Sequence, residues 1–479
     1  METPFIGREA EKNILLKAMN SREAEMVAVI GRRRVGKTFL VRSVFNNNLD
    51  FELTGIQNAP IKEQLENFTT RLNDHARPIL PFQQPLNWLQ AFHQLATYLT
   101  SIKKEEKWVV FLDELPWMAT RRSDFIRALG WFWNSWASRQ PVVVVICGSA
   151  ASWMIQNVVQ DKGGLHNRIT RRVHLMPFSL YETQLFLKSR DIYLDPYQVL
   201  QLYMAMGGIP HYLKEIEGDK SAAQNIDQIC FASSGLLLDE FSMLYTSLFD
   251  NSETHICVIR ALAQTWQGLT RDELIKKTAL PNGGNTTKII EELANSGFIA
   301  AYYSFGKKKK DLRYRLTDEY SLFYIQFIEP NRSEGRGTWE KLSQTQTWKT
   351  WSGYAFESIC LKHVGQIKKA LSIGGVYSEA SSFYSKTDEQ QRGVQIDLLI
   401  DRNDHVINLC ELKFYNTEFV PNQRFATEIR QKVAIFKALT NTPKQIFVTL
   451  ITTFPLLPNQ HSIGLIHQNL TMDVLFEPD

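Results

Sequence analysis

Residues 31–38 combine glycine, lysine and threonine at a spacing that could bind a polyphosphate. They read GRRRVGKT and follow the apolar run Glu25–Gly31. Glycines let the backbone wrap around phosphates, whose charge then lies against N–H groups and a helix N-terminus. A lysine at this place reaches the β- and γ-phosphates, and the threonine hydroxyl binds Mg²⁺. The alternative is a glycine turn that binds nothing. The predicted ATP-binding residues are Gly31, Arg32, Arg33, Arg34, Val35, Gly36, Lys37 and Thr38.

Two further apolar runs end in polar side chains that suit the same chemistry. Asp113 and Glu114 follow VVFL, where the first carboxylate can bind the Mg²⁺ of a nucleotide and the second can polarise the attacking water. Ser149 ends the run PVVVVICGS, at a position where a hydroxyl can sense the γ-phosphate. The alternatives are two acids at a solvent-exposed strand end and a simple Gly-Ser turn.

A second group of reactive side chains lies near the C-terminus. The stretches QIDLLI (395–400) and VINLCELK (406–413) alternate around a polar turn and predict a β-hairpin. If the hairpin is symmetric about Asp404, then Asp397 and Glu411 lie opposite each other, and Lys413 shares their face. Two carboxylates can hold Mg²⁺ or Mn²⁺ against a phosphodiester, while a lysine positions water and offsets the developing charge.

An upstream helix adds one acid to this group. Trp351–His363 predicts an amphipathic helix whose Glu357 could complete a metal ligand set with Asp397 and Glu411. Two other interpretations stay open: a salt-bridged hairpin in which Lys413 pairs with Glu411, and a fold that binds nucleic acid without cutting it.

The middle of the chain carries a lysine-rich turn. Residues 255–320 predict three helices followed by two short strands, the pattern of a winged helix. The strands flank GKKKK, and such a tip is a phosphate-seeking surface that predicts contact with nucleic acid, in the first place DNA. The alternatives are a solvated tip and packing against protein. The predicted DNA-binding residues are Lys307, Lys308, Lys309, Lys310, Arg313 and Arg315.

Elements that could position these residues follow from the apolar pattern. The three apolar runs of the first 180 residues predict parallel strands covered by crossover helices on both faces, and therefore an α/β sheet. Residues 177–250 look helical, 329–339 are polar enough for a linker, and the remainder returns to mixed α/β. The predicted domains are 1–178, a P-loop ATPase core; 179–250, a helical lid; 251–330, a winged helix; and 339–479, an α/β domain.

Several of these stretches together resemble the archaeal-type ATPases of the AAA+/STAND group. They are FIGRE, GRRRVGKT, VVFLDEL, CGSAASW and NRITRRVHLMPFSLYE, with GGIPHYL resembling the lid motif of that group. The resemblance implies that Ser149 is a sensor, that Arg168 reaches the γ-phosphate of a neighbouring subunit in a homo-oligomer, and that Pro210 lies near the adenine. A solvated arginine and a plain helix break are the respective alternatives.

The C-terminal group resembles the PD-(D/E)XK nuclease superfamily, whose restriction-endonuclease-like fold is then expected for 339–479. Asp397 takes the place of the motif aspartate, Glu411 and Lys413 that of the ExK pair, and Glu357 that of the helix acid. Ile396 stands where the motif has proline. The pairing of this domain with an archaeal-type ATPase resembles the family that carries the domain of unknown function numbered 234.

The composition of the chain narrows the classes of protein to which it can belong. The 479 residues are 44% hydrophobic and 22% charged, which is typical of globular domains. No apolar run reaches membrane-spanning length, and the N-terminus predicts no secretory signal. Five separated cysteines favour a reducing cytoplasm over a disulfide framework or a zinc site. The net charge of +4 is too small to imply nucleic acid by itself.

The sequence therefore predicts an ATP-hydrolysing core coupled to a nucleic-acid-binding and Mg²⁺-dependent DNA-cleaving C-terminal domain. The competing prediction is a nucleotide-dependent switch whose C-terminal domain binds DNA or protein without cleavage. A tryptophan-rich stretch, ALGWFWNSWAS with Trp131, Trp133 and Trp136, predicts a helix that packs on the sheet rather than one that stacks on bases.

Overall fold

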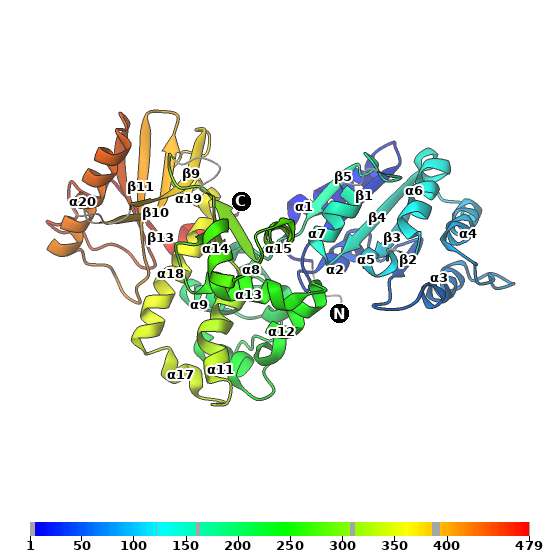
Figure 1. The fold of residues 1–479 in the computed structure, drawn as a ribbon, viewed down its shortest axis with the longest axis horizontal. Helices are drawn as coiled ribbons and strands as arrows, with labels where there is room; N and C mark the ends of the chain where they lie inside the picture. Colours follow the sequence, from blue (N-terminus) through cyan, green and yellow to red (C-terminus); the bar gives the residue numbers. More distant parts are fainter. Residues whose placement is uncertain (1–4, 121, 160–162, 307–311, 386–392, 479) are drawn as a thin grey trace. The chain divides into compact units, whose positions relative to one another are not determined.

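The computed structural model describes residues 5–120, 122–159, 163–306, 312–385 and 393–478 (Figure 1). The chain divides into two compact units. The first comprises Met1–Pro177 with Thr246–Asp250, and the second comprises Phe178–Tyr245 with Asn251–Asp479. Within the described ranges, no helix combines the length and apolar character that a membrane crossing requires.

A five-stranded parallel sheet forms the centre of the first unit, in the order β2-β3-β4-β1-β5. The three strands predicted from apolar runs are present, and every residue in them is buried. The two edge strands were not predicted, because they are short and carry buried residues only at alternate positions or at one position. The strands are β1 (Glu25–Ile30), β2 (Phe51–Thr54), β3 (Trp108–Asp113), β4 (Val142–Gly148) and β5 (Arg171–His174).

Helices of the first unit pack on this sheet through a core rich in aromatic residues. Trp133 is buried and Trp136 stacks on Trp108 with ring centroids 5.8 Å apart, so the packing interpretation of the tryptophan-rich helix is confirmed for both. Trp131 is 43% exposed. The helices are α1 (Glu9–Asn20), α2 (Lys37–Val44), α3 (Ile61–Ala76), α4 (Trp88–Ser101), α5 (Leu115–Met118), α6 (Phe125–Ser135) and α7 (Ala151–Met154).

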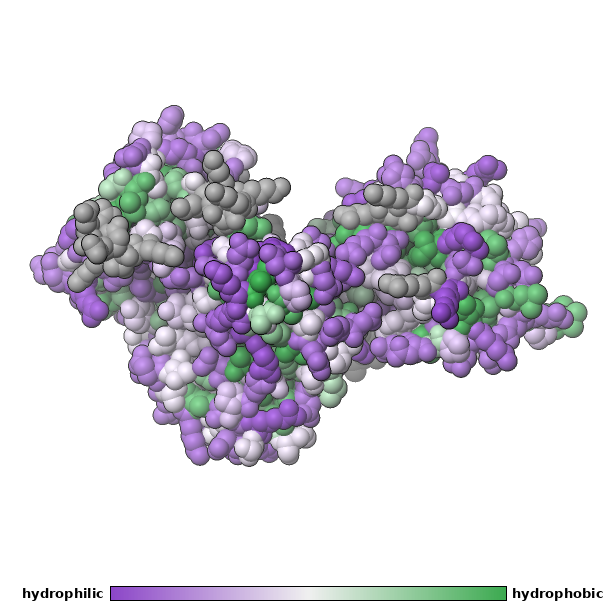
Figure 2. All heavy atoms as spheres, in the orientation of Figure 1, coloured by the Kyte–Doolittle hydropathy of each residue, from purple (hydrophilic) through white to green (hydrophobic). Residues whose placement is uncertain are grey.

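The loop between α3 and α4 displays apolar side chains to solvent. Polar residues cover much of the face drawn in Figure 2, whereas apolar residues stand out at the edge of the first unit that this loop forms. Ile79, Leu80 and Leu86 are each more than four-fifths exposed. The loop is nevertheless held in place, because Asn73 bonds both the N–H and the C=O of Phe82.

The second unit begins with helices that pack around each other. Serine side chains with the matching N3 residue cap two of them, Ser179 before α8 and Ser221 before α11, as the capping-box pattern requires. The N–H of Leu180 donates to Nε2 of His363, which ties the start of α8 to the end of α18. The helices are α8 (Leu180–Lys188), α9 (Pro196–Met206), α10 (Pro210–Leu213), α11 (Ala222–Phe231), α12 (Leu236–Leu248) and α18 (Gln346–Lys362).

The three helices and two strands predicted between residues 255 and 320 are present. A two-residue strand joins them, so that a three-stranded antiparallel sheet forms in the order β6-β8-β7. Thr270 caps the second helix as predicted, because its hydroxyl accepts from the N–H of Glu273. The elements are α13 (Ser252–Ala263), β6 (Leu269–Thr270), α14 (Arg271–Thr278), α15 (Gly284–Asn295), β7 (Ile299–Tyr302) and β8 (Arg313–Leu316).

A second five-stranded sheet, in the order β13-β12-β11-β10-β9, forms the C-terminal part of this unit. Strands β9, β10 and β11 are antiparallel neighbours, while β11, β12 and β13 are parallel. The parallel step from β11 to β12 passes through α20, as such crossovers require. The elements are α19 (Val364–Ala370), β9 (Ser378–Ser385), β10 (Val394–Arg402), β11 (Val406–Lys413), α20 (Gln423–Thr440), β12 (Gln445–Thr452) and β13 (Gln468–Thr471).

The segment 329–339 differs from the predicted linker. It contains a short 3-10 turn and leads into α17 (Thr338–Leu342), whose Trp339 is 2% exposed. Trp339 lies against Phe323 and Trp348, each at 4.9 Å between ring centroids. The carboxylate of Asp227 accepts the N–H of Gly337 and of Trp339 at 2.7 and 2.8 Å. One buried aromatic side chain therefore fixes a segment whose polar composition indicated a free connection.

We expect Trp339→Ala to lower the free energy of unfolding of the second unit by about 3–5 kcal/mol, because it leaves a cavity among aromatic rings. Chemical denaturation followed by circular dichroism measures this. Tyr193, 73% exposed in the same unit, provides the control, since Tyr193→Ala should change stability by only about 0.5 kcal/mol. Equal effects of the two substitutions would contradict the structural role of Trp339.

Candidate functional site

The loop 31–36 turns tightly between β1 and α2 in a way that depends on both of its glycines. Gly36 has φ of +94° and stands directly before α2, where a side chain would be strained. A Cβ on Gly31 would lie 2.5 Å from the carbonyl oxygen of Leu175. Arg32 and Val35 are buried, whereas Arg33 is exposed. The loop therefore presents its backbone at a helix N-terminus, the geometry that binds phosphate.

Lys37 is the first residue of α2 and is 6% exposed. Its Nζ donates to the carbonyl oxygen of Arg32 at 3.0 Å, so the ammonium group lies over the loop to which it belongs. A lysine held there supplies positive charge at the place where the loop amides converge.

Strand order brings three polar residues to this loop. Because β4 lies between β1 and β3, the carboxyl ends of all three strands meet at one edge of the sheet. The Thr38 hydroxyl donates to Asp113 Oδ2 at 2.7 Å. Glu114 Oε2 accepts from both the N–H and the hydroxyl of Ser149, at 3.0 and 2.8 Å. Five of the residues predicted for ATP chemistry, Lys37, Thr38, Asp113, Glu114 and Ser149, thus occupy one edge.

Thr38 and Asp113 form a donor set that fits a magnesium ion. Both present hard oxygen atoms, in direct contact with each other. Mg²⁺ in phosphate-binding sites takes one or two such protein oxygens and completes its shell with phosphate and water. The residues present therefore fit the ion predicted from the sequence.

Two residues assigned by resemblance stand apart from this geometry. Arg168 is exposed in the turn that precedes β5, and its N–H donates to the carbonyl of Leu165. Pro210 is the first residue of α10 in the second unit. Contact of Arg168 with a neighbouring subunit and of Pro210 with adenine remain predictions.

The hairpin of β10 and β11 has the predicted register. Leu398 pairs with Cys410, and Asp401 pairs with Ile407. The hairpin is therefore symmetric about Asp404. Asp397 and Glu411 each lie one residue beyond the Leu398–Cys410 pair, where the regular pairing of the two strands ends. Buried Glu411 receives Lys413 at 2.8 Å on one oxygen and Lys432 of α20 at 2.8 Å on the other.

These two lysines determine the charge of Glu411. Burial alone would raise the pKa of the carboxyl, but the ammonium groups of Lys413 and Lys432 outweigh it and hold the pKa below its ordinary value. Burial likewise opposes the charge of Lys413, yet the contact with Glu411 raises the pKa of the lysine. Sequence reasoning missed Lys432, which lies 21 residues from Glu411 on a different element. Only the packing of α20 on the sheet brings it there.

Asp397 and Glu357 line a shared cavity of about 250 Å³. Asp397 Oδ1 accepts the side-chain amide of Gln395 at 2.6 Å. Glu357 extends from α18, and burial, followed by the negative charge of Asp397, raises its pKa well above the ordinary value. The structure thus brings the predicted helix acid to the hairpin.

These acidic side chains do not form a ready metal centre. In the described ranges, no group of three His, Cys, Asp or Glu side chains is close enough to hold a metal ion. Both oxygens of Glu411 are already engaged by lysines. In this arrangement the residues do not fit the divalent ion that the resemblance implied.

Arg313 and Arg315, the two arginines predicted to bind DNA, both lie on β8 but have different environments. Arg313 binds the carbonyls of Gln267 and Gly268 and pairs with Glu273 at 2.8 Å. Arg315 lies over the ring of Tyr302, 4.2 Å from its centroid, and lines the cavity of Glu357 and Asp397. Both are therefore engaged within the protein. The predicted tip, Lys307, Lys308, Lys309 and Lys310, lies outside the described residues.

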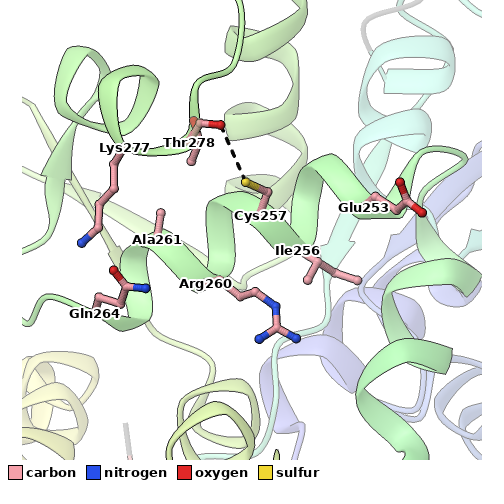
Figure 3. A pocket seen from close by; sticks show the side chains of 8 residues that line it. All are labelled: Glu253, Ile256, Cys257, Arg260, Ala261, Gln264, Lys277 and Thr278. Carbon is pink, nitrogen blue, oxygen red and sulfur yellow. Dashed lines mark hydrogen bonds between the residues drawn. The ribbon is translucent and has the colours of Figure 1, made fainter.

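A second depression, of about 380 Å³, lies on α13 and α14 (Figure 3). Arg260 from its floor makes two bonds of 2.6 Å to Glu329, and the Cys257 thiol faces the Thr278 carbonyl. The side chain of Arg260 is thus paired with Glu329, outside the set of residues that line the depression.

Comparison with known proteins finds a family model that is similar to the part of the chain carrying the first of these sites. Residues 5–216 match the ATPase domain described as predominantly from Archaea. An uncharacterized protein of Methanocaldococcus jannaschii, MJECL04, is 20% identical over 414 residues, which is 86% of this chain and 87% of that protein.

Two solved structures are similar to this chain at low sequence identity. The Walker-type ATPase paby2304 of Pyrococcus abyssi is 16% identical with a TM-score of 0.49, over 66% of this chain and 95% of that one. The ORC2 protein of Aeropyrum pernix is 15% identical with a TM-score of 0.40, over 68% and 94%. The family match covers the loop, the acidic pair and Ser149 in one stretch. Residues 5–216 are therefore similar to archaeal-type ATPase domains, and they contain the parallel sheet and the phosphate-binding loop described above.

Proposed function

We propose that this protein hydrolyses ATP at the edge formed by β1, β3 and β4, and that hydrolysis governs how its C-terminal part engages nucleic acid. The contact between the Thr38 hydroxyl and Asp113, beside a glycine loop that ends in Lys37, carries the first half of the proposal. This arrangement brings the proposed sites for phosphate, metal and water together at one edge of the sheet.

Each residue has a definable task in that reaction. Lys37 and the loop amides neutralise the β- and γ-phosphates, and Thr38 and Asp113 would hold Mg²⁺, which withdraws charge from the phosphate oxygens. Glu114 accepts a hydrogen bond from the water, whose oxygen attacks the γ-phosphorus while the bond to the β-phosphate oxygen breaks. The two bonds from Ser149 orient Glu114 for this task. Arg168 of a second copy is proposed to reach the γ-phosphate.

The second half concerns nucleic acid. The order of α13, α14, α15 and the sheet β6-β8-β7 supports a winged-helix fold for 251–330. The sheet of β9–β13 with α18 and α20 supports a restriction-endonuclease-like fold for 339–479. We propose DNA as the first partner to test, since phosphate contacts by clustered lysines dominate such affinity.

Binding without cleavage is the form that the C-terminal geometry favours. Glu411 is neutralised by two lysines, and the described carboxylates form no metal cluster. The protein is then a nucleotide-dependent switch. Phosphodiester cleavage is the second candidate, because Asp397, Glu411 and Lys413 occur at the predicted register with Glu357 beside Asp397.

Lys37→Ala should abolish ATP hydrolysis, because the phosphate charge is no longer neutralised. Glu114→Gln should retain ATP binding and lower turnover about a hundredfold or more, because Asp113 remains while the water loses its negatively charged base. Phosphate release and nucleotide titration measure the two effects. Lys17, exposed on α1, gives a control of equal charge loss. Wild-type turnover in Glu114→Gln would refute its role.

We expect purified protein to bind DNA and to leave plasmid, linear and single-stranded DNA intact with Mg²⁺ or Mn²⁺, with and without ATP. Gel electrophoresis and a calorimetric Mn²⁺ titration check this. Cleavage that vanishes in Asp397→Ala and Lys413→Ala, but persists in the exposed control Arg430→Ala, would contradict the switch and establish the nuclease instead.

Glu357→Gln should stabilise the second unit increasingly as pH rises above 4.5, the ordinary pKa of the carboxyl. The folded state holds the Glu357 proton to higher pH than the unfolded state, so wild-type stability falls with pH until the raised pKa is passed. Below pH 4.5 the two proteins should melt alike. Melting temperatures across a pH series, with exposed Glu334→Gln as control, test this. A difference independent of pH would argue against the raised pKa.

A further inference from the structure

The cavity of Glu357 and Asp397 is built from two structural parts of the second unit. One wall comes from the hairpin of β7 and β8, and the other from α18, β9 and β10. The parts are joined by hydrogen bonds: the N–H of Phe305 donates to Ser382 at 2.7 Å, and Gln267 bonds Gln395 at 3.0 Å. Phe305 also packs on Phe436, with ring centroids 5.2 Å apart. The hairpin therefore belongs to the cavity as firmly as the sheet does.

Arg315 is held so that its charged end faces this cavity. Its Nε donates to the Tyr302 hydroxyl at 2.5 Å while its guanidinium lies 4.2 Å from the Tyr302 ring centroid. The Tyr302 hydroxyl in turn donates to the Gln267 carbonyl. Within the described part of the chain, the terminal nitrogens of Arg315 have no hydrogen-bond acceptor and form no ion pair. A guanidinium fixed in this way can bind two phosphate oxygens at once with little loss of side-chain entropy.

Part of the cavity lining is aromatic. Trp266 and Tyr354 stack with ring centroids 4.6 Å apart and an interplanar angle of 11°, and both line the cavity. Stacking on aromatic rings is how proteins hold unpaired bases without regard to sequence. A paired base within a duplex offers no free face to such a wall.

The volume of the cavity limits the form of nucleic acid that can bind in it. A volume of about 250 Å³ lies just below the roughly 300–1,000 Å³ of typical small-molecule pockets. It admits one nucleotide at most, and a double helix cannot enter it.

We propose that this cavity binds one unpaired nucleotide of a single strand, with Arg315 on its phosphate and Trp266 and Tyr354 beside its base. The proposal rests on the proposed engagement of nucleic acid and names the form in which it is engaged. It also gives Arg315 a task different from contact with the outside of a duplex. Glu357 and Asp397 line the same cavity.

The test measures binding in the absence of divalent ions, so that cleavage plays no part. Fluorescence anisotropy compares a labelled single-stranded oligonucleotide with a blunt-ended duplex of two complementary strands of equal length. Wild-type protein should prefer the single strand, and Arg315→Gln should weaken that binding about tenfold or more. Arg430→Gln, an equal charge loss at an exposed position of α20, should bind as wild type does.

A second variant fills the cavity and leaves Arg315 in place. Ala301 lines it on β7 and is exposed, so Ala301→Trp should block the nucleotide without unfolding the protein. Melting curves verify folding of both variants. Loss of single-strand binding in Ala301→Trp and Arg315→Gln, with Arg430→Gln unchanged, supports the proposal.

Other outcomes distinguish a failure of the proposed nucleic-acid function from a failure of the cavity proposal alone. If wild-type protein binds neither oligonucleotide, the proposed nucleic-acid function fails and the cavity proposal with it. If it binds the single strand but Arg315→Gln and Ala301→Trp bind equally well, the cavity proposal alone is overturned. Equal or tighter binding of the duplex, with the same dependence on Arg315, overturns the single-strand assignment.

Discussion

The position of β4 between β1 and β3 is the constraint on which the ATP site depends. Parallel strands deliver their carboxyl ends to one edge, and a central strand sets the spacing between its neighbours. With β4 in between, Ser149 can reach Glu114 while Thr38 spans to Asp113. No contact within the phosphate loop itself could produce that arrangement. The buried aliphatic residues of these strands thus affect the ATP site indirectly, because their packing helps to hold the strands in this order.

In the second unit, the charge of a buried carboxylate must be balanced. Burying a carboxylate such as Glu411 is costly unless opposite charge accompanies it, and removal of one partner from such a group is destabilising. Here two lysines from two elements supply the charge. For Glu357, by contrast, burial and the negative charge of Asp397 both raise the pKa of the carboxyl. The pKa values of Glu357 and Glu411 are therefore shifted in opposite directions.

Sequence reasoning succeeded where function depends on local order. The loop 31–38, the acidic pair and the register of the β10–β11 hairpin are short-range features with strong residue preferences, and each occurs as predicted. It failed where distant elements meet. Lys432, the fixed segment around Trp339 and the docking of Phe305 beside Ser382 all depend on packing between elements that no periodicity reveals. The short edge strands β2 and β5 were missed because half-buried strands carry a weak apolar signal.

The attachment of the hairpin to β9 has a consequence for solubility. Strand β9 is the last strand of its sheet, and an uncovered edge offers unpaired N–H and C=O groups to other chains. The bridge between Ser304 and Ser382, with the bond from Phe305, occupies part of that edge. The C-terminal sheet produced without the hairpin would expose this edge together with the apolar surface under Phe305. The hairpin thus protects its neighbour from self-association, and the two parts are best handled as one piece.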